Sequence, residues 1–144
     1  MSTTYFSGTT TADATHPAVT ITATSNDDMY TIFKKALDLE FYPTVEVAAE
    51  ELPPRAGALP EDYILISMNR LETEYSNGVS FFLCGYFDVI IVTHTLTALE
   101  GYDRRIRNAL VSRNFCETGN SGVMQTEDEY AVGYRSEYLF RKEY

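Results

Sequence analysis

The chain has 144 residues, and its 21 acidic and 11 basic side chains give a formal net charge of −10. Hydrophobic residues make up 44% of the chain, enough to bury the core of one domain, so disorder throughout is excluded. A protein that coats duplex nucleic acid or an anionic membrane needs clustered Lys and Arg, and the acidic balance argues against both classes.

No segment approaches the roughly 20 apolar residues that cross a bilayer. The first residues lack the basic and apolar regions of a secretory signal. We therefore expect neither a membrane span nor a signal peptide. The only cysteines, Cys84 and Cys116, lie far apart and without metal-ligand spacing, which is typical of reduced thiols in a cytosolic protein.

Residues 1–25 form a Thr-rich N-terminal arm with a single charge, Asp13. Val19, Ile21 and Ala23 alternate with threonines, which predicts a short strand. Two interpretations stay open for this arm. It is either a frayed tail or a segment that adds a strand to a neighbouring sheet. Residues 26–144 are expected to form a single domain.

The domain is predicted to open with an amphipathic helix. Asp27 and Asp28 supply an N-cap and favourable first-turn charge. Apolar residues then follow at helical spacing, and Pro43 ends the helix. Those residues are Met29, Ile32, Phe33, Ala36 and Leu37.

A strand over 44–48 is predicted next, followed by an acidic, Pro-rich loop over 49–62. A strand over 63–71 then leads to the turn Ser76-Asn77-Gly78, a strong hairpin signal. The return strand runs from Val79 to Thr93, and Gly85 within it predicts a bulge or bend.

A second helix is expected to open at Thr95 or Thr97, and Thr97 with Glu100 fits a capping box. The residues that follow predict a polar connection over 114–122, a strand over 123–126, an acidic turn over 127–129 and a last strand over 130–140. Together these elements predict an α+β fold. It has a mostly antiparallel sheet with a long β-hairpin, and two helices packed on one face.

No group of residues predicts an enzyme, a cofactor or a metal site. His94 stands at a strand-to-helix junction without a nucleophile elbow nearby, so we expect it to bond to backbone. Cys84 lies in an apolar strand and is expected to be buried, whereas no His is fixed near Cys116. The acidic pairs lack the spacing of a calcium loop and are typical of solvated charge.

Four of the eleven basic residues gather on the second helix, at Arg104, Arg105, Arg107 and Arg113. Such a cluster either faces nucleic acid or pairs with carboxylates of this chain or of a neighbour. The excess of acids favours pairing, since guanidinium groups grip carboxylates at two points. We expect these arginines to meet carboxylates between subunits.

Five segments carry the overall pattern: the helix DDMYTIFKKALDL, the strand FYPTVEV, the strand ending GYFDVIIVT, the helix with GYDRRIRNALV, and the final EYAVGYRSEYLFRKEY. In this order they resemble the tail terminator, or tail completion, proteins of long-tailed bacteriophages. The resemblance covers about residues 26–144 at the level of element order. The arm before Ser25 and the loop over 49–62 depart from the family's pattern.

The resemblance implies a homo-oligomeric ring, usually a hexamer, that caps the tail tube, stops its growth and joins tail to head. Its partners would be the tail tube protein and a head or neck connector protein, and DNA would pass through the lumen without specific binding. The location would be the virion, at the head–tail junction, after assembly in the host cytoplasm.

Ring closure requires two different faces of one subunit to meet. We expect the acidic loop with Glu50 and Glu51 to contact the second helix at Arg104, Arg105 and Arg107. The surface facing the tube is expected at the hairpin tip and the Pro-rich loop. Its residues are Arg55, Glu72, Glu74, Asn77 and Gly78.

Three other functions stay open. A head-completion or neck connector protein is also small and ring-forming. A soluble adaptor would use the hairpin edge to bind a strand of a partner. A small hydrolase would need an activated His94 or Cys116.

Overall fold

The computed structural model describes residues 2–54, 56–58, 60–76, 78–125 and 132–143. Within them the fold is α+β, as predicted, with a five-stranded sheet in the order β3-β4-β5-β7-β6. The strands are β3 (Glu46–Ala49), β4 (Tyr63–Ser76), β5 (Val79–Thr93), β6 (Cys116–Gln125) and β7 (Val132–Glu143). In this sheet β3 and β4 pair in parallel, and the other neighbours are antiparallel.

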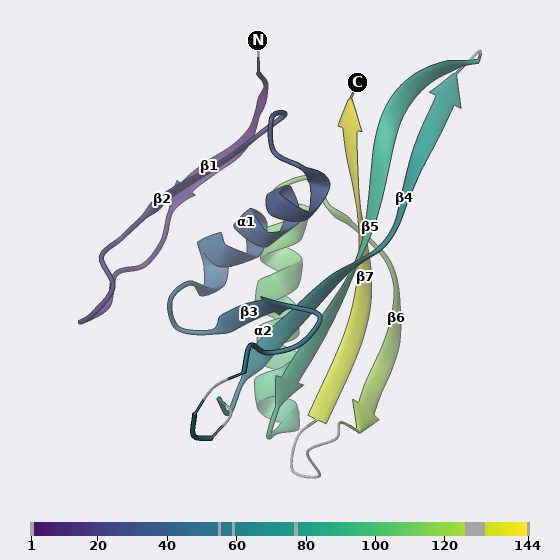
Figure 1. The fold of residues 1–144 in the computed structure, drawn as a ribbon. Coiled ribbons are helices and arrows are strands. Elements are labelled where there is room, and N and C mark those ends of the chain that lie inside the picture. The colour runs from purple at the N-terminus through teal and green to yellow at the C-terminus, as the bar shows by residue number, and fades with distance from the viewer. Residues whose placement is uncertain (1, 55, 59, 77, 126–131, 144) are drawn as a thin grey trace.

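Helices α1 (Met29–Phe41) and α2 (Leu96–Val111) cover one face of this sheet (Figure 1). A second sheet, formed by β1 (Thr4–Thr9) and β2 (Thr20–Thr24), lies on the outer side of α1. The core between helices and sheet is rich in aromatic rings. Phe33 of α1 stacks on Phe87 of β5 with ring centroids 4.3 Å apart, and Phe115 packs against both.

Helix α1 has the predicted N-cap and end, but it begins at Met29, so the predicted first-turn charge is wrong: Asp27 and Asp28 both precede the first turn. The Asp28 carboxylate caps it by accepting a 2.8 Å hydrogen bond from the Thr31 N–H, which satisfies an otherwise unpaired donor of the first turn. The helix ends at Phe41, just before Pro43, and its predicted apolar residues are buried. Those residues are Met29, Ile32, Phe33, Ala36 and Leu37.

The predicted capping box at the start of the second helix is wrong. Helix α2 begins at Leu96, and its N-cap is Thr95, the other expected start. The Thr95 hydroxyl accepts a 3.1 Å hydrogen bond from the Ala98 N–H. Strand β5 ends at Thr93, which leaves Thr95 in the extended conformation that an N-cap needs. This start brings Leu96 into the helix and leaves it 58% exposed.

The Thr-rich segment forms its own antiparallel hairpin, with β2 where the alternating pattern predicts a strand. Within this chain the segment is therefore a two-stranded sheet of its own, and the addition of a strand to the sheet of another chain stays a prediction. Ala23 is fully buried against the core, and the Tyr5 ring meets the Phe140 ring edge-on at 5.3 Å. Lys35 of α1 holds β2 against the helix by donating a 2.8 Å hydrogen bond to the Thr22 carbonyl.

The hairpin of β4 and β5 is longer than predicted on its first strand and extends past the helices (Figure 1). Gly78 adopts a φ of 76°, as expected for the turn. The bulge predicted at Gly85 is instead in the partner strand, where Asn69 is the extra residue between Met68 and Arg70. Gly85 has a packing role, because an added Cβ would lie 2.9 Å from the Phe87 ring.

The polar connection predicted over 114–122 is also wrong, because most of it is the edge strand β6, which starts at Cys116. Its polar and Gly-rich residues show no alternation, yet backbone pairing with β7 holds them, with irregular register near Gly119 and Gly122. The predicted turn over 127–129 lies outside the described residues. Strand β7 extends to Glu143, beyond the predicted end at 140.

Candidate assembly surfaces

The hairpin tip presents carboxylates on the helix-free face of the sheet. Arg141 of β7 donates to the Glu74 carboxylate at 3.1 Å, and Glu72 lies 3.6 Å from Arg70. The Arg70 guanidinium also lies 3.9 Å from the centroid of the Tyr86 ring. The predicted tube-facing charges are therefore partly neutralised by arginines of the same face, which holds them in fixed positions.

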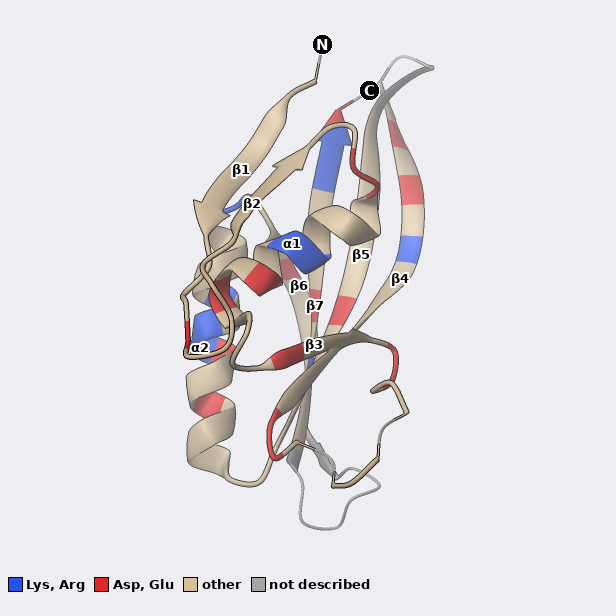
Figure 2. Cartoon of the chain, turned by 60° about the vertical axis from the view of Figure 1, so that its left-hand side comes forward, with Lys and Arg blue, Asp and Glu red and all other residues tan. Residues whose placement is uncertain are grey.

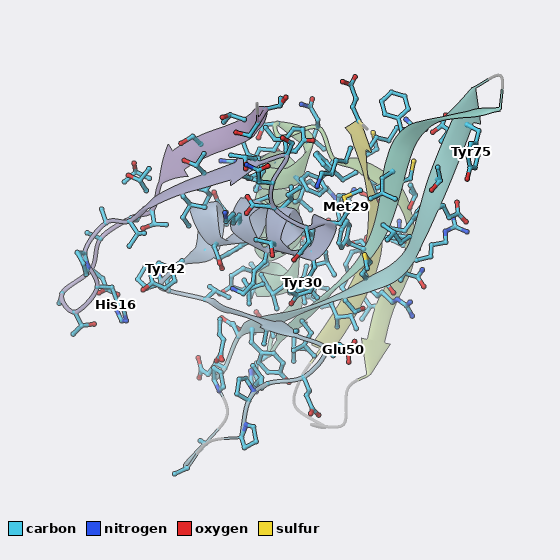
Figure 3. The ribbon with its side chains drawn as sticks, turned by 45° about the horizontal axis from the view of Figure 1, so that its top comes forward. His16, Met29, Tyr30, Tyr42, Glu50 and Tyr75 are labelled. Carbon is cyan, nitrogen blue, oxygen red and sulfur yellow. The ribbon has the colours of Figure 1, made fainter. Side chains whose placement is uncertain are left out.

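The opposite face of the same hairpin exposes apolar side chains. Leu71 and Tyr75 alternate with the carboxylates along β4, and their side chains are 49% and 64% exposed. Met68, nearer the helices, is 41% exposed. Figure 3 shows Tyr75 near the far end of the hairpin, well away from Met29 of α1. Apolar groups clustered on a projecting element are typical of a contact surface.

Two predicted tube-facing residues, Arg55 and Asn77, lie outside the described residues. The other predicted residues are Glu72, Glu74 and Gly78, and the structure brings them together on one hairpin. Strand β3 pairs only with Tyr63–Ile66 of β4, so the edge of β4 beyond Ser67 has no neighbouring strand in the described part of the chain. An open edge of this kind can accept a strand from another chain.

The arginines of α2 differ in what they contact. Arg105 donates to the Glu40 carboxylate at 2.8 Å and lies over the Phe41 ring at 4.6 Å. Arg107 pairs with Asp103 at 2.8 Å and with Glu117 of β6. Both are thus already paired within the chain, so their predicted pairing between subunits would require exchange of these contacts.

Arg104 lies on α2, whereas Arg113, predicted on the same helix, follows its C-cap Ser112. Arg113 donates to the Ala109 carbonyl at 2.7 Å and lies 5.8 Å from the Phe6 ring centroid. Arg104 is exposed and has no ion pair, hydrogen bond or ring contact among the described residues. Figure 2 shows basic residues on α2, with acidic residues spread over both helices, the strands and the loops. Arg104 is therefore the member of the cluster that is available to a partner.

Glu50 and Glu51, the predicted acidic partners of α2, lie just after β3 (Figure 3 labels Glu50). Glu50 adopts a φ of 61° and donates its N–H to the Ile66 carbonyl at 2.8 Å, which holds its backbone against β4. Within the described residues, neither carboxylate forms an ion pair with the arginines of α2. Their predicted contact between subunits stays a prediction.

A polar network on the helix-free face of the sheet had no signal in the sequence. Glu137 of β7 accepts 2.6 Å hydrogen bonds from Thr118 of β6 and from Asn69, the bulge residue of β4. The bond from Thr118, followed by that from Asn69, lowers the pKa of Glu137. Arg135 binds the buried Asp88 carboxylate at 2.5 Å beside it. The network spans strands that are distant in sequence, so only the register places it together.

The three residues with catalytic chemistry, His94, Cys84 and Cys116, lie in different surroundings. The Nδ1 atom of His94 lies 2.8 Å from the Glu61 carbonyl, which confirms a junction histidine bonded to backbone. Cys84 is buried, as predicted, and burial raises the pKa of its thiol. Cys116 is exposed. No three His, Cys, Asp or Glu side chains of the described residues are grouped as a metal site requires.

No family model matches the chain, and no curated protein matches it. Of the helices in the described part of the chain, none has the length and apolar character needed to cross a bilayer.

Proposed function

We propose that this chain is a self-assembling structural subunit whose ring caps the tail tube of a long-tailed bacteriophage. The observation that carries the proposal is the hairpin of β4 and β5, which extends past the helices and exposes Leu71 and Tyr75 on one face. Burying two such side chains against a partner contributes about 3 kcal/mol. The resemblance in element order supplies the identity of the assembly.

The charge distribution supports a ring through which DNA passes. The chain carries a net charge of −10, so a lumen lined by its acidic residues repels phosphate groups and leaves DNA free to move. The basic residues of α2 give the subunit a second, different face, as a heterologous interface requires. In this proposal the protein is not an enzyme and acts in the virion at the head–tail junction.

The experiment is electron microscopy of the purified protein, alone and with tail tube subunits of the same virus. We expect closed rings, and we expect tubes that stop growing when the protein is added. Compact monomers under both conditions would overturn the proposal. Rings that bind the head vertex and leave tube growth unchanged would favour the function of a neck connector protein instead.

A variant of the hairpin tests which surface meets the tube. Replacing Leu71 and Tyr75 together by Ser removes the exposed apolar groups without changing a buried residue. We expect rings to form as before and tube capping to weaken by about tenfold or more. The matched control replaces Leu96 and Val123 by Ser; these are 58% and 59% exposed elsewhere, and capping should be unchanged. Equal loss in both variants would contradict the assignment of the tube-facing surface.

A further inference from the structure

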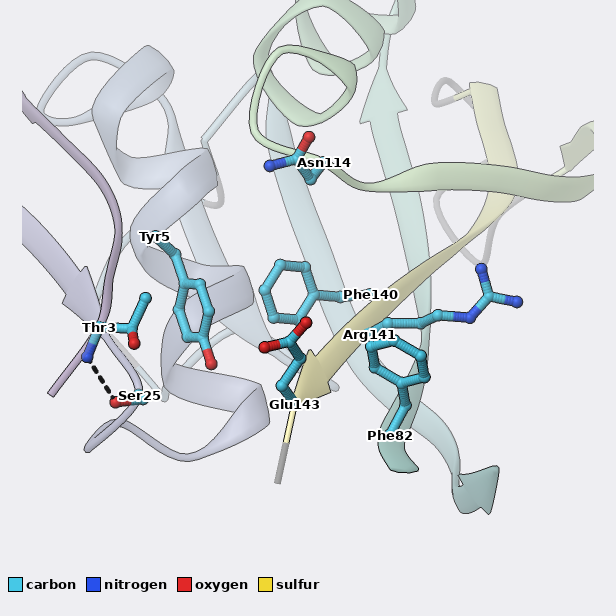
Figure 4. A pocket seen from close by; sticks show the side chains of 8 residues that line it. All are labelled: Thr3, Tyr5, Ser25, Phe82, Asn114, Phe140, Arg141 and Glu143. Carbon is cyan, nitrogen blue, oxygen red and sulfur yellow. Dashed lines mark hydrogen bonds between the residues drawn. The ribbon is translucent and has the colours of Figure 1, made fainter. Parts of the chain in front are cut away.

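A slot of about 470 Å³ opens between the N-terminal hairpin and the end of β7 (Figure 4). Its apolar walls are the rings of Tyr5, Phe82 and Phe140. Its polar lining includes the side chains of Asn114, Arg141 and Glu143. Strand β6 begins opposite Leu139, so among the described residues no strand pairs with the end of β7 on that side, and this opens the slot.

The charge inside the slot is negative. Figure 4 shows the Glu143 carboxylate directed toward the space between Tyr5 and Phe140. Arg141 also lines the slot, but its guanidinium pairs with Glu74 at 3.1 Å, so that positive charge is balanced. Glu143 forms no ion pair with the described residues. Aromatic rings together with an unbalanced carboxylate attract a cation, which interacts with both the ring faces and the negative charge.

The same chain shows which cation such a site holds. Arg105 lies over the Phe41 ring at 4.6 Å while it binds the Glu40 carboxylate at 2.8 Å. Arg70 lies over the Tyr86 ring at 3.9 Å, with Glu72 at 3.6 Å. Each of these sites combines a guanidinium, an aromatic ring and a carboxylate. The slot has the rings and the carboxylate, and it lacks an unpaired guanidinium.

Within the described part of the chain, the guanidinium of Arg104 lacks both a carboxylate and a ring. It is exposed on α2, and it has no carboxylate, ring or carbonyl partner among the described residues. We propose that the slot of one subunit binds the Arg104 guanidinium of a second copy of the chain. The other described arginines each have at least one partner of these kinds: Arg70, Arg105, Arg107, Arg113, Arg135 and Arg141.

This inference rests on the proposed self-assembly. The sequence predicts that Glu50 and Glu51 bind the arginines of the neighbouring subunit, and here Glu143 takes that role for Arg104. Because Arg104 and the slot belong to different parts of one subunit, the contact is heterologous and propagates around a ring. The planar guanidinium enters between the rings, and its N–H groups donate to the Glu143 carboxylate. Lys would lack this flat, bidentate geometry.

Two charge reversals test the pair. R104E brings a second carboxylate to Glu143, and E143R brings a second guanidinium to Arg104, so each variant alone should lose at least about tenfold in subunit association by analytical ultracentrifugation. Mixed in equal amounts, the two chains present opposite charges at every interface when they alternate. The mixture should therefore form rings again. Thermal unfolding of each variant, followed by circular dichroism, should match the unaltered protein because both side chains are exposed.

E51R is the matched comparison, since it reverses the acidic residue of the competing acceptor. If E51R restores rings to R104E and E143R does not, the slot is not the acceptor. If E143R alone assembles as well as the unaltered chain, the inference is also wrong, while the proposed function stands. If the unaltered chain forms no rings even with tube subunits, it is the proposed function that fails.

Discussion

Tyr102 of helix α2 is hydrogen-bonded to the loop that precedes β4. Its hydroxyl donates a 2.7 Å hydrogen bond to Asp62, which also accepts a 2.5 Å bond from Thr93. Burial, and then the bond to Asp62, raise the pKa of Tyr102 to about 12 from 10.0. The folded state therefore holds the phenolic proton more tightly than the unfolded state, so this group stabilises the fold fully below about pH 10.

The pH dependence follows from that sign. We expect the contribution of Tyr102 to stability to fall as pH rises from about 10 to about 12. Y102F should lower the free energy of unfolding at neutral pH by about 1–2 kcal/mol and flatten the alkaline decline. Urea unfolding at several pH values measures the free energy of unfolding at neutral pH and its decline at alkaline pH. The control is Y75F. Because Tyr75 is 64% exposed, this substitution should change neither the free energy of unfolding at neutral pH nor its alkaline decline. Parallel alkaline curves for Y102F and the unaltered protein would contradict this role.

Two glycines should respond oppositely to the same substitution. In Gly85→Ala the new Cβ would lie 2.9 Å from Phe87 and 3.3 Å from Met29, so we expect a loss of about 1–3 kcal/mol. Gly101 lies within α2, and a Cβ there would meet no atom within 4 Å, so Gly101→Ala should gain about 0.5–1 kcal/mol from helix propensity. Chemical denaturation compares the two, and a destabilised Gly101→Ala would contradict the open space at that position.

At the scale of elements, the start of α2 is tested by two neighbouring threonines. Thr95→Ala removes the hydroxyl that accepts from the Ala98 N–H and should cost about 1 kcal/mol of stability. Thr97→Ala changes an exposed side chain inside the first turn, and we expect a change within about 0.5 kcal/mol. Thermal unfolding of both variants measures the difference. The reverse order would place the cap at Thr97.

Strong periodicity made some elements predictable. The apolar spacing of α1, the Asn-Gly turn and the apolar run of β5 are local signals, and each marks its element correctly. Strand β1 and the first half of β6 carry mostly Thr, Gly and other polar residues, so their partner strands hold them extended. Local pattern also contains no information on partners, which is why the parallel pairing of β3 was not expected.

The candidate surfaces were predictable to a smaller extent. The hairpin tip and the basic helix are each contiguous in sequence, so the sequence alone indicates both as candidate surfaces. The partner of Arg105 is Glu40, 65 positions away, and nothing in the sequence links the two. The slot is harder still to predict from the sequence, since it combines residues 5, 82, 114 and 143 from four separate segments. Such sites depend on register and packing.

At the scale of the whole molecule, the N-terminal arm belongs to the folded body. Ala23 is fully buried, and Tyr5 and Phe6 pack against the core. A chain that begins at Asn26 should lose about 3 kcal/mol or more of unfolding free energy, because these apolar surfaces become exposed. Differential scanning calorimetry measures the loss as a lower Tm. An unchanged Tm would mean that the domain from 26 to 144 is stable without the arm.

The bulge at Asn69 sets which side chains of β4 lie on each face of the hairpin. Before it, even-numbered residues of β4 face the helices, as Ile64 and Ile66 do; after it, the odd-numbered Leu71 takes that face. Deleting Asn69 would therefore leave every later side chain on its present face while removing local twist. The deletion would also remove the hydrogen bond from Asn69 to Glu137. Under the proposed function, it would point the same contact surface in a new direction and fit it to a tube of different diameter.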